Sequence, residues 1–463
     1  MRIEWTDIAA GRVDTAAGTV VEVTGFPVAA AADRRAACFL LVPENPCCPG
    51  HVPAGALAAV EVFADSPVPV RMGALRLTGE WHVGSDETGA WRYCLRGART
   101  LDPPGWSGIG RRGLIAGGPL MCLGASACDP GDPKRAAAAR AAIEAGVTVD
   151  IHSHAGGIAS DDRLALGTGF SPIAAPMRAG GMGAVCLAMV ADGGTIRTTP
   201  DGRIRPFRDP APGELRDRGA RKFDAILRLV RNEGLRVIAT AADLRATRPG
   251  SPGVIVASEG ADFLEGRIDA LDEAWRRWTL RHLQLTHYRV NPLGDIQTEA
   301  PVHGGLTDFG AAVIRRCDTL GIVVDVAHGT TELVRRAAAV TSKPLVLSHT
   351  SLSERPGPFS RLISPAHAKL VADTGGVIGI WPPAGIFPSM AAFAMGIARM
   401  ARVVGVDHVA LGSDIRGLTG GSVFPDYDRL PALAEALLDA GFSPDDTAKV
   451  LGGNYARVFA ASV

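Results

Sequence analysis

The sequence predicts an α/β fold in two parts, a (β/α)8 TIM barrel preceded by a small all-β domain. Short β-branched or apolar runs separated by Pro, Gly and Asp occupy the first hundred residues. Eight short apolar strands follow from residue 147, most of them succeeded by an amphipathic helix, which is the pattern of a (β/α)8 barrel. A doubly wound sheet is the alternative, but no G-x-G-x-x-G fingerprint follows the first of these strands.

The composition narrows the class of protein. The 463 residues carry 48 Lys and Arg against 48 Asp and Glu, so the zero formal charge disfavours nucleic acid as a partner. The hydrophobic share of 47% and the charged share of 21% fit a globular protein and exclude disorder or a polytopic membrane protein. The eight cysteines show no disulfide-framework spacing, so we expect buried thiols.

Residues 1–103 predict a small β-barrel domain of the OB type. Five or six short strands within about a hundred residues are typical of such a barrel. The expected strands are Thr19–Val23, Cys38–Val42, Ala58–Phe63, Gly73–Gly79 and Trp91–Gly97. Cys47, Cys48 and His51 cluster in one turn, and without a second Cys/His pair nearby we favour buried thiols over a metal site. We assign this domain no catalytic role.

Residues 104–146 form the expected linker. Arg111-Arg112 precedes an apolar run that ends in Ala125-Ser126-Ala127, which is the pattern of a twin-arginine export signal at an internal position. A buried linker, an export signal and a membrane anchor are the three interpretations, and the run is shorter than the ~20 residues that span a bilayer. An export signal would make the protein periplasmic or membrane-associated, and otherwise we expect it to be cytoplasmic.

Residues 147–463 predict the barrel. The expected strands are Val147–His152, Ala184–Val190, Val254–Glu259, Leu283–His287, Ile322–His328, Pro344–His349, Val377–Trp381 and Val409–Asp414, with Val237–Thr240 as an accessory strand. The expected helices are Leu215–Asn232, Arg267–Arg281, Asp308–Leu320, Glu332–Val340, Pro365–Asp373, Ala391–Val404 and Leu430–Ala440.

The strand ends carry the functional signal, because active sites of such barrels lie at the carboxyl ends of the strands. Five of the eleven histidines and two carboxylates fall there: His152, His154, Glu259, His287, His328, His349 and Asp414. A lone histidine is more often a core or surface residue, but five at strand ends indicate one site.

These residue types favour a metal. Side chains two apart on a strand face the same way, so His152 and His154 can present two imidazoles to one ion. Imidazole and carboxylate without thiolate suit Zn²⁺, with Mn²⁺, Fe²⁺ or Co²⁺ as alternatives. The donors suffice for two ions only if one is shared, and the two oxygens of Glu259 make it the natural bridge.

The motifs from about Val147 to Val463 resemble those of the membrane (renal-type) dipeptidases, a branch of the amidohydrolase superfamily. They match in the family order: the His-x-His/Asp of the first strand, Ser258-Glu259-Gly260, Leu285-Thr286-His287, Asp325-Val-Ala-His328, Ser348-His349-Thr350-Ser351, Gly412-Ser413-Asp414 and Gly453-Asn454-Tyr455-Ala-Arg457-Val-Phe459.

The resemblance implies a role for each matching residue. His152 and His154 would bind one zinc, His328 and His349 the second, and Glu259 both. Asp414 would contact the first ion and carry a proton, His287 would lie over the scissile carbonyl, and Arg361 would bind the substrate carboxylate.

The sequence departs from the family at three positions. His154 stands where the family usually has Asp, which keeps a ligand but raises the formal charge of the site by about one. Arg416 and Leu362 replace an Asp and an Asn near the substrate, so the motifs alone do not establish a preference for dipeptides.

The leading hypothesis is a dinuclear zinc dipeptidase, in which a metal-bridged hydroxide attacks the amide bond of dipeptides, including those with D-configured C-terminal residues. The alternatives are a metal-dependent lactone or phosphoester hydrolase on the same barrel and a non-catalytic binding module. The expected partner is a small dipeptide. The resemblance also allows a homodimer, and the sequence leaves membrane association open.

Overall fold

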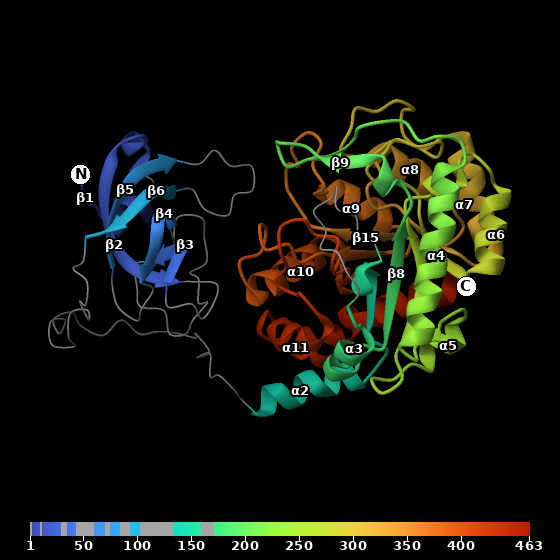
Figure 1. Cartoon of the computed structure of the whole chain (residues 1–463). Helices are drawn as coiled ribbons and strands as arrows, with labels where there is room; N and C mark the ends of the chain where they lie inside the picture. The colour runs from blue at the N-terminus through green and yellow to red at the C-terminus, as the bar shows by residue number, and fades with distance from the viewer. Residues whose placement is uncertain are drawn as a thin grey trace. The chain divides into compact units, whose positions relative to one another are not determined.

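The structure is a computed structural model that describes residues 2–9, 12–28, 35–42, 60–69, 75–83, 93–101, 133–158 and 171–463. The chain divides into two compact units, residues 1–130 and 131–463 (Figure 1). The Arg111-Arg112 segment and the cluster of Cys47, Cys48 and His51 lie outside the described residues.

The first unit is an all-β domain, as predicted. Its strands are β1 (Arg2–Ile3), β2 (Val20–Val28), β3 (Arg35–Val42), β4 (Val60–Pro69), β5 (Leu75–Val83) and β6 (Tyr93–Thr100), with the short helices α1 (Trp5–Ala9) and η1 (Asp14–Ala16). The strand order is β1-β2-β3-β4-β6-β5, and β5 also pairs with β2. Strands β2 to β6 therefore close into a five-stranded ring, the strand number of an OB-type barrel.

Alternation along the strands builds the core of this unit, because successive side chains point to opposite faces. Val21 and Val23 of β2 are buried, as are Trp81 and Tyr93, whose rings stack with centroids 5.1 Å apart. Trp81 Nε1 donates to the carbonyl of Val13 at 3.2 Å.

The second unit is the predicted barrel of eight parallel strands. They are β7 (Val149–Ser153), β8 (Ala184–Val190), β12 (Gly253–Glu259), β13 (Leu280–Gln284), β14 (Val323–Asp325), β15 (Val346–Thr350), β16 (Val377–Ile380) and β17 (Val409–Leu411), paired in that order. Two hydrogen bonds join the last strand end to the first, from Asp414 N to His152 O and from His154 N to Ile415 O, both at 2.9 Å. The barrel therefore closes at its carboxyl rim.

Helices surround the strands (Figure 1). They are α2 (Pro133–Glu144), α3 (Ala174–Gly180), α4 (Glu214–Asn232), α5 (Ala241–Arg245), α6 (Asp269–Arg277), α7 (Asp308–Leu320), α8 (Thr331–Val340), α9 (Pro365–Ala372), α10 (Met390–Val404), α11 (Leu430–Asp439), α12 (Pro444–Ala448) and α13 (Asn454–Ser462). Short strand β11 (Arg236–Val237) pairs with β12, where we expected an accessory strand. No helix in the described part of the chain is long and apolar enough to cross a bilayer.

Helix α2 lies within the segment expected to be a linker. It belongs to the barrel unit, where Arg135 forms an ion pair with Asp439 of α11 at 3.0 Å. Ala139, Ala142 and Ile143 form its buried face.

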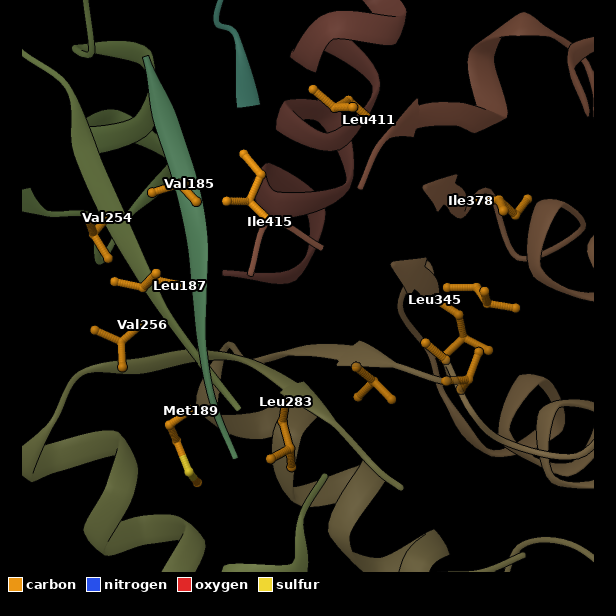
Figure 2. Close-up of a cluster of buried hydrophobic side chains, with 14 of the residues drawn as sticks. Val185, Leu187, Met189, Val254, Val256, Leu283, Leu345, Ile378, Leu411 and Ile415 are labelled. Atoms are coloured by element: carbon orange, nitrogen blue, oxygen red, sulfur yellow. The ribbon is translucent and has the colours of Figure 1, made fainter. Parts of the chain in front are cut away.

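The barrel strands are buried on both faces. On β8, Val185, Leu187 and Met189 face the outer core under the helices, beside Val254 and Val256 of β12 (Figure 2). The intervening residues fill the barrel, and Ala184, Cys186 and Ala188 belong to this inner core. This explains why the strands are continuous apolar runs and why polar groups gather only at their ends.

Strand β13 corrects one expectation. We expected the fourth strand to begin at Leu283, but it starts at Leu280, and His282 is buried within it. Its ring bonds the hydroxyl of Tyr455 through Nδ1 at 2.8 Å and Asp325 through Nε2 at 3.1 Å. His282 therefore connects α13 to the barrel interior through two hydrogen bonds. The fourth strand begins three residues earlier than its apolar pattern suggests, and this places His282 inside the barrel.

Candidate metal centre

Seven polar side chains meet at the carboxyl rim of the barrel. They come from six strand ends and are all at most 6% exposed: His152, His154, Glu259, His287, His328, His349 and Asp414. The two ends joined by the closing hydrogen bonds contribute His152, His154 and Asp414. The structure thus brings together all six residues expected as metal ligands, together with His287.

Glu259 lies at the centre of this cluster. Its Oε1 is 3.1 Å from His328 Nε2, 3.3 Å from His349 Nε2 and 3.6 Å from His152 Nε2. Its Oε2 is 3.0 Å from His154 Nε2 and 3.2 Å from His287 Nε2. Oε1 therefore faces His328 and His349, and Oε2 faces His154, so the two carboxylate oxygens lie against different imidazoles, as a bridging ligand requires. His152 is the imidazole between these two groups, since it belongs to donor groups with His154 and with His349.

The donor atoms form three groups compact enough to hold an ion, among the described residues: His152, His154 and Asp414; His152, Glu259 and His349; and Glu259, His287 and His328. His152 Nε2 and Asp414 Oδ1 are buried without a hydrogen-bond partner in the described part of the chain. Buried polar atoms normally have hydrogen-bond partners. Two such atoms that lack a partner and belong to the same group are therefore suited to bind a cation.

The outer ring nitrogens are held by the barrel. His154 Nδ1 lies 2.9 Å from the carbonyl oxygen of Ala188, which can only accept, so Nδ1 carries a proton and Nε2 is the nitrogen that faces Glu259. Ser348 Oγ contacts His152 Nδ1 at 3.3 Å and His349 Nδ1 at 2.9 Å. Such outer contacts orient imidazoles towards a metal.

Burial and charge set the protonation of the cluster. Burial lowers the pKa of His152 and of His328 well below the ordinary value, and that of His349 to about 4. Burial opposes ionisation of Glu259, but the surrounding imidazoles, His287 foremost, hold its pKa well below its usual range. His152, His328 and His349 are therefore neutral beside an ionised carboxylate, which is the state in which imidazole and carboxylate bind metal. At His154, burial also opposes protonation, but Glu259 and Asp414 outweigh it and raise the pKa of this ring.

Backbone geometry at the rim is specialised. His328 and Asp414 adopt left-handed backbone conformations, with φ of 65° and 50°, which are uncommon for residues other than Gly and Asn. Gly417 packs against the same cluster, where a Cβ atom would lie 1.9 Å from Asp414 Oδ1 and 2.6 Å from His154 Cδ2. Such strained or close-packed backbone concentrates at functional sites.

A cavity of about 260 Å³ opens over the cluster. Its polar lining comes mainly from the metal cluster, with Tyr288 and Thr419 in addition. Its apolar lining includes Val190, Ile204, Trp381, Ile386 and Leu418. Ile204 belongs to a hairpin of β9 (Ile196–Thr198) and β10 (Ile204–Pro206), which follows the second barrel strand. Loops after the second, seventh and eighth strands therefore shape the cavity.

Arg361 lies next to this cavity and is not among its lining residues. Its Nη1 donates to Gln297 Oε1 at 2.8 Å and its Nη2 to the carbonyl of His349 at 3.3 Å. Its guanidinium lies 5.4 Å from the centre of the Trp381 ring, which does line the cavity. Arg416 is exposed and also lies outside the lining.

Asp192 is a polar residue of the site that the sequence reasoning missed. It follows β8 by two residues, is 1% exposed, and accepts a hydrogen bond from His287 Nδ1 at 2.8 Å. Burial opposes protonation of His287, but Asp192 and Glu259 outweigh it and raise its pKa to about 9. The strand-end rule could have found Asp192 if it had been applied to the second strand.

Eight parallel strands, encircling helices and a rim of imidazoles and carboxylates define the class of amidohydrolase-type barrels. Within this class, the sequence profile of the membrane dipeptidase family (peptidase family M19) matches residues 173–462. The chain belongs to this family, which confirms the resemblance seen in its motifs. The match begins after His152 and His154.

Curated relatives are dipeptidases by name. Dipeptidase aclJ of Aspergillus oryzae is 30% identical over 223 residues, which cover 45% of this chain and 51% of that protein. Dipeptidase tcpJ of Claviceps purpurea is 27% identical over 224 residues, which cover 46% of this chain and 52% of that protein. The chain thus spans about half the length of the curated relatives it matches.

Solved structures share the fold. The probable dipeptidase PvdM of Pseudomonas aeruginosa superposes with a TM-score of 0.59 at 18% identity, covering 72% of this chain and 99% of that one. A metallopeptidase of Rhodobacter sphaeroides was solved with a phosphinate mimic of the dipeptide L-Ala-D-Ala. It superposes with a TM-score of 0.56 at 19% identity, and the match covers 69% of this chain and 99% of that one.

Proposed function

We propose that the protein is a metal-dependent dipeptidase that uses two divalent ions, zinc in the first instance, to hydrolyse the amide bond of small dipeptides. The central observation is Glu259, whose two oxygens face separate groups of imidazoles beneath one cavity. Membership of the dipeptidase family supports this assignment.

The chain's own residues would divide into two metal sites. His152, His154 and Asp414 would hold one ion, His328 and His349 the other, and Glu259 both. Divalent ions in such a setting polarise a carbonyl oxygen and lower the pKa of water, which makes hydrolysis possible at neutral pH. His154 in place of the usual Asp keeps a donor atom, 3.5 Å from Asp414 Oδ1.

Three side chains would act on the substrate. His287 lines the cavity and would donate a hydrogen bond from Nε2 to the scissile carbonyl oxygen as negative charge develops on it. Asp414 also lines the cavity and would carry a proton from water to the leaving nitrogen. Arg361 would attract the substrate's terminal carboxylate, which its planar guanidinium suits.

The cavity also bears on the substrate. Its volume of about 260 Å³ suits a small ligand, and its apolar walls at Ile204, Trp381 and Leu418 would accommodate apolar side chains. We include D-configured C-terminal residues among the proposed substrates, with the mimic-bound Rhodobacter structure as the reason for testing L-Ala-D-Ala first.

The test is a substrate panel on the zinc-loaded full chain. Dipeptides with L- and D-configured C-terminal residues are compared with lactones and phosphotriesters, and Asp414→Asn serves as the inactive reference. We expect dipeptide turnover that falls at least about a hundredfold in Asp414→Asn. Turnover of lactones or phosphotriesters without dipeptide turnover would contradict the proposal.

A further inference from the structure

Asp192 is a buried carboxylate at the end of β8, a strand to which the proposed metal centre assigns no ligand. It opens a single 3-10 turn, η4 (Asp192–Gly194). Thr195 closes this turn, donating from both its N–H and its hydroxyl to the Asp192 carbonyl oxygen at 2.8 Å. The backbone that carries the Asp192 side chain is therefore fixed.

The hydrogen bonding of Asp192 differs from that of other buried carboxylates in the barrel. Asp295 accepts from the backbone N–H groups of Val302, His303 and Gly305, so its carboxylate organises a loop. Asp192 Oδ1 instead accepts from His287 Nδ1, and Asp192 Oδ2 is buried without a hydrogen-bond partner among the described residues. The Asp192 carboxylate thus accepts its hydrogen bond from a histidine ring, whereas the Asp295 carboxylate accepts its hydrogen bonds from backbone N–H groups.

This contact determines how His287 lies. A carboxylate accepts hydrogen bonds, so His287 Nδ1 must carry a proton and Nε2 is the nitrogen left for the cavity. Nε2 lies on the Glu259 side, 3.2 Å from Oε2. A flipped ring would place a carbon-bound hydrogen against Asp192 and leave a buried charge without its hydrogen bond, which is costly.

We propose that Asp192 is a positioning residue for hydrolysis, which holds the His287 ring so that Nε2 faces the scissile carbonyl. The inference rests on the proposed dipeptidase function, because that function places the substrate against His287. Asp192 itself is not among the residues that line the cavity, so it acts through His287.

A double-mutant cycle on the metal-loaded full chain tests this role. We expect Asp192→Ala to lower kcat for L-Ala-D-Ala at least about tenfold with little change in KM, as loss of an outer contact does. Asp192→Asn keeps an acceptor oxygen and should recover much of that loss. In a His287→Gln background, Asp192→Ala should have no further effect.

Asp295→Asn is the matched control, a buried carboxylate whose partners are backbone groups. Asp295→Asn should change kcat by the same factor in the wild-type and the His287→Gln backgrounds. Equal losses from Asp192→Ala in both backgrounds, or equal impairment in Asp192→Asn and Asp192→Ala, would overturn the positioning role.

An imidazole N–H spectrum gives a readout that does not depend on turnover. In protein labelled with ¹⁵N-histidine, the His287 Nδ1–H should give a downfield signal that disappears in His287→Gln and Asp192→Ala and survives in Asp192→Asn. Dipeptide turnover without this signal would overturn the positioning role alone. If the signal is present but no dipeptide is hydrolysed, the proposed function is wrong. The proposed orientation of His287 towards a dipeptide substrate then falls with it.

Discussion

The Nε2 atoms of His328 and His349 lie 3.0 Å apart at neighbouring strand ends, and both lie within 3.3 Å of Glu259 Oε1. Burial lowers the pKa of both rings, so two neutral imidazoles turn their Nε2 atoms towards one carboxylate oxygen. We expect His349→Gln to lower the zinc retained after dialysis from about two ions per chain to about one. Elemental analysis measures this.

His408→Gln is the control for metal content, because His408 Nδ1 bonds the carbonyl oxygen of Gly376 at 2.8 Å and lies in none of the donor groups. It should retain the wild-type zinc content. If His349→Gln kept the same zinc content as His408→Gln, the second ion site would be wrong.

Gly417 should be essential for the site although it contributes no ligand. In Gly417→Ala the added Cβ would overlap Asp414 Oδ1, so Asp414 must move. We expect kcat to fall at least about tenfold, because a displacement of about 1 Å can cost a hundredfold in rate. Gly420→Ala is the matched control, since Gly420 lines the same cavity and a Cβ there meets no atom within 4 Å. Equal activity of the two variants would show that the contact does not matter.

Arg361 should select for a free terminal carboxylate. A charge-assisted hydrogen bond contributes roughly 1.5–3 kcal/mol, so Arg361→Ala should raise KM for a dipeptide by about 10- to 100-fold. KM for the corresponding dipeptide amide should change little. The exposed Arg416 gives the control, and Arg416→Ala should leave both values unchanged. A parallel rise in KM for dipeptide and amide would instead assign Arg361 to the cavity wall, where it contacts Gln297 and Trp381.

His367 should make the fold sensitive to acid. The ring is 3% exposed, and burial, with a contribution from Arg361, lowers its pKa to about 4, against about 6.5 in an unfolded chain. The unfolded state then binds the proton more readily, so the stabilisation is complete above pH 6.5 and is lost as the pH falls towards 4. This group alone should remove about 2 kcal/mol between pH 7.5 and pH 5.

Urea unfolding of wild type and His367→Gln at the two pH values measures this contribution. The free energy of unfolding should fall less on acidification in the variant, by about 2 kcal/mol. His408→Gln should show the wild-type dependence. Identical losses in wild type and His367→Gln would rule out His367 as the source.

The sequence alone predicted the architecture because the barrel strands are short apolar runs, most of which end in polar residues. All eight strands and the accessory pairing at Val237 were found. The boundaries were less predictable, as β13 shows: it begins at Leu280 because His282 finds polar partners inside the barrel, Tyr455 and Asp325, that no local pattern reveals.

The candidate site followed from the same rule, since parallel strands in a barrel bring their carboxyl ends to one rim. Residue types and strand positions therefore determined which side chains meet there. Only the tertiary structure decided how they meet: Glu259 lies at the centre, Asp192 holds His287, and Gly417 packs against Asp414. The contacts of Glu259 with His154 and of Asp192 with His287 join residues 105 and 95 positions apart. Side-chain directions and close contacts at such separations depend on the closed barrel rather than on local sequence.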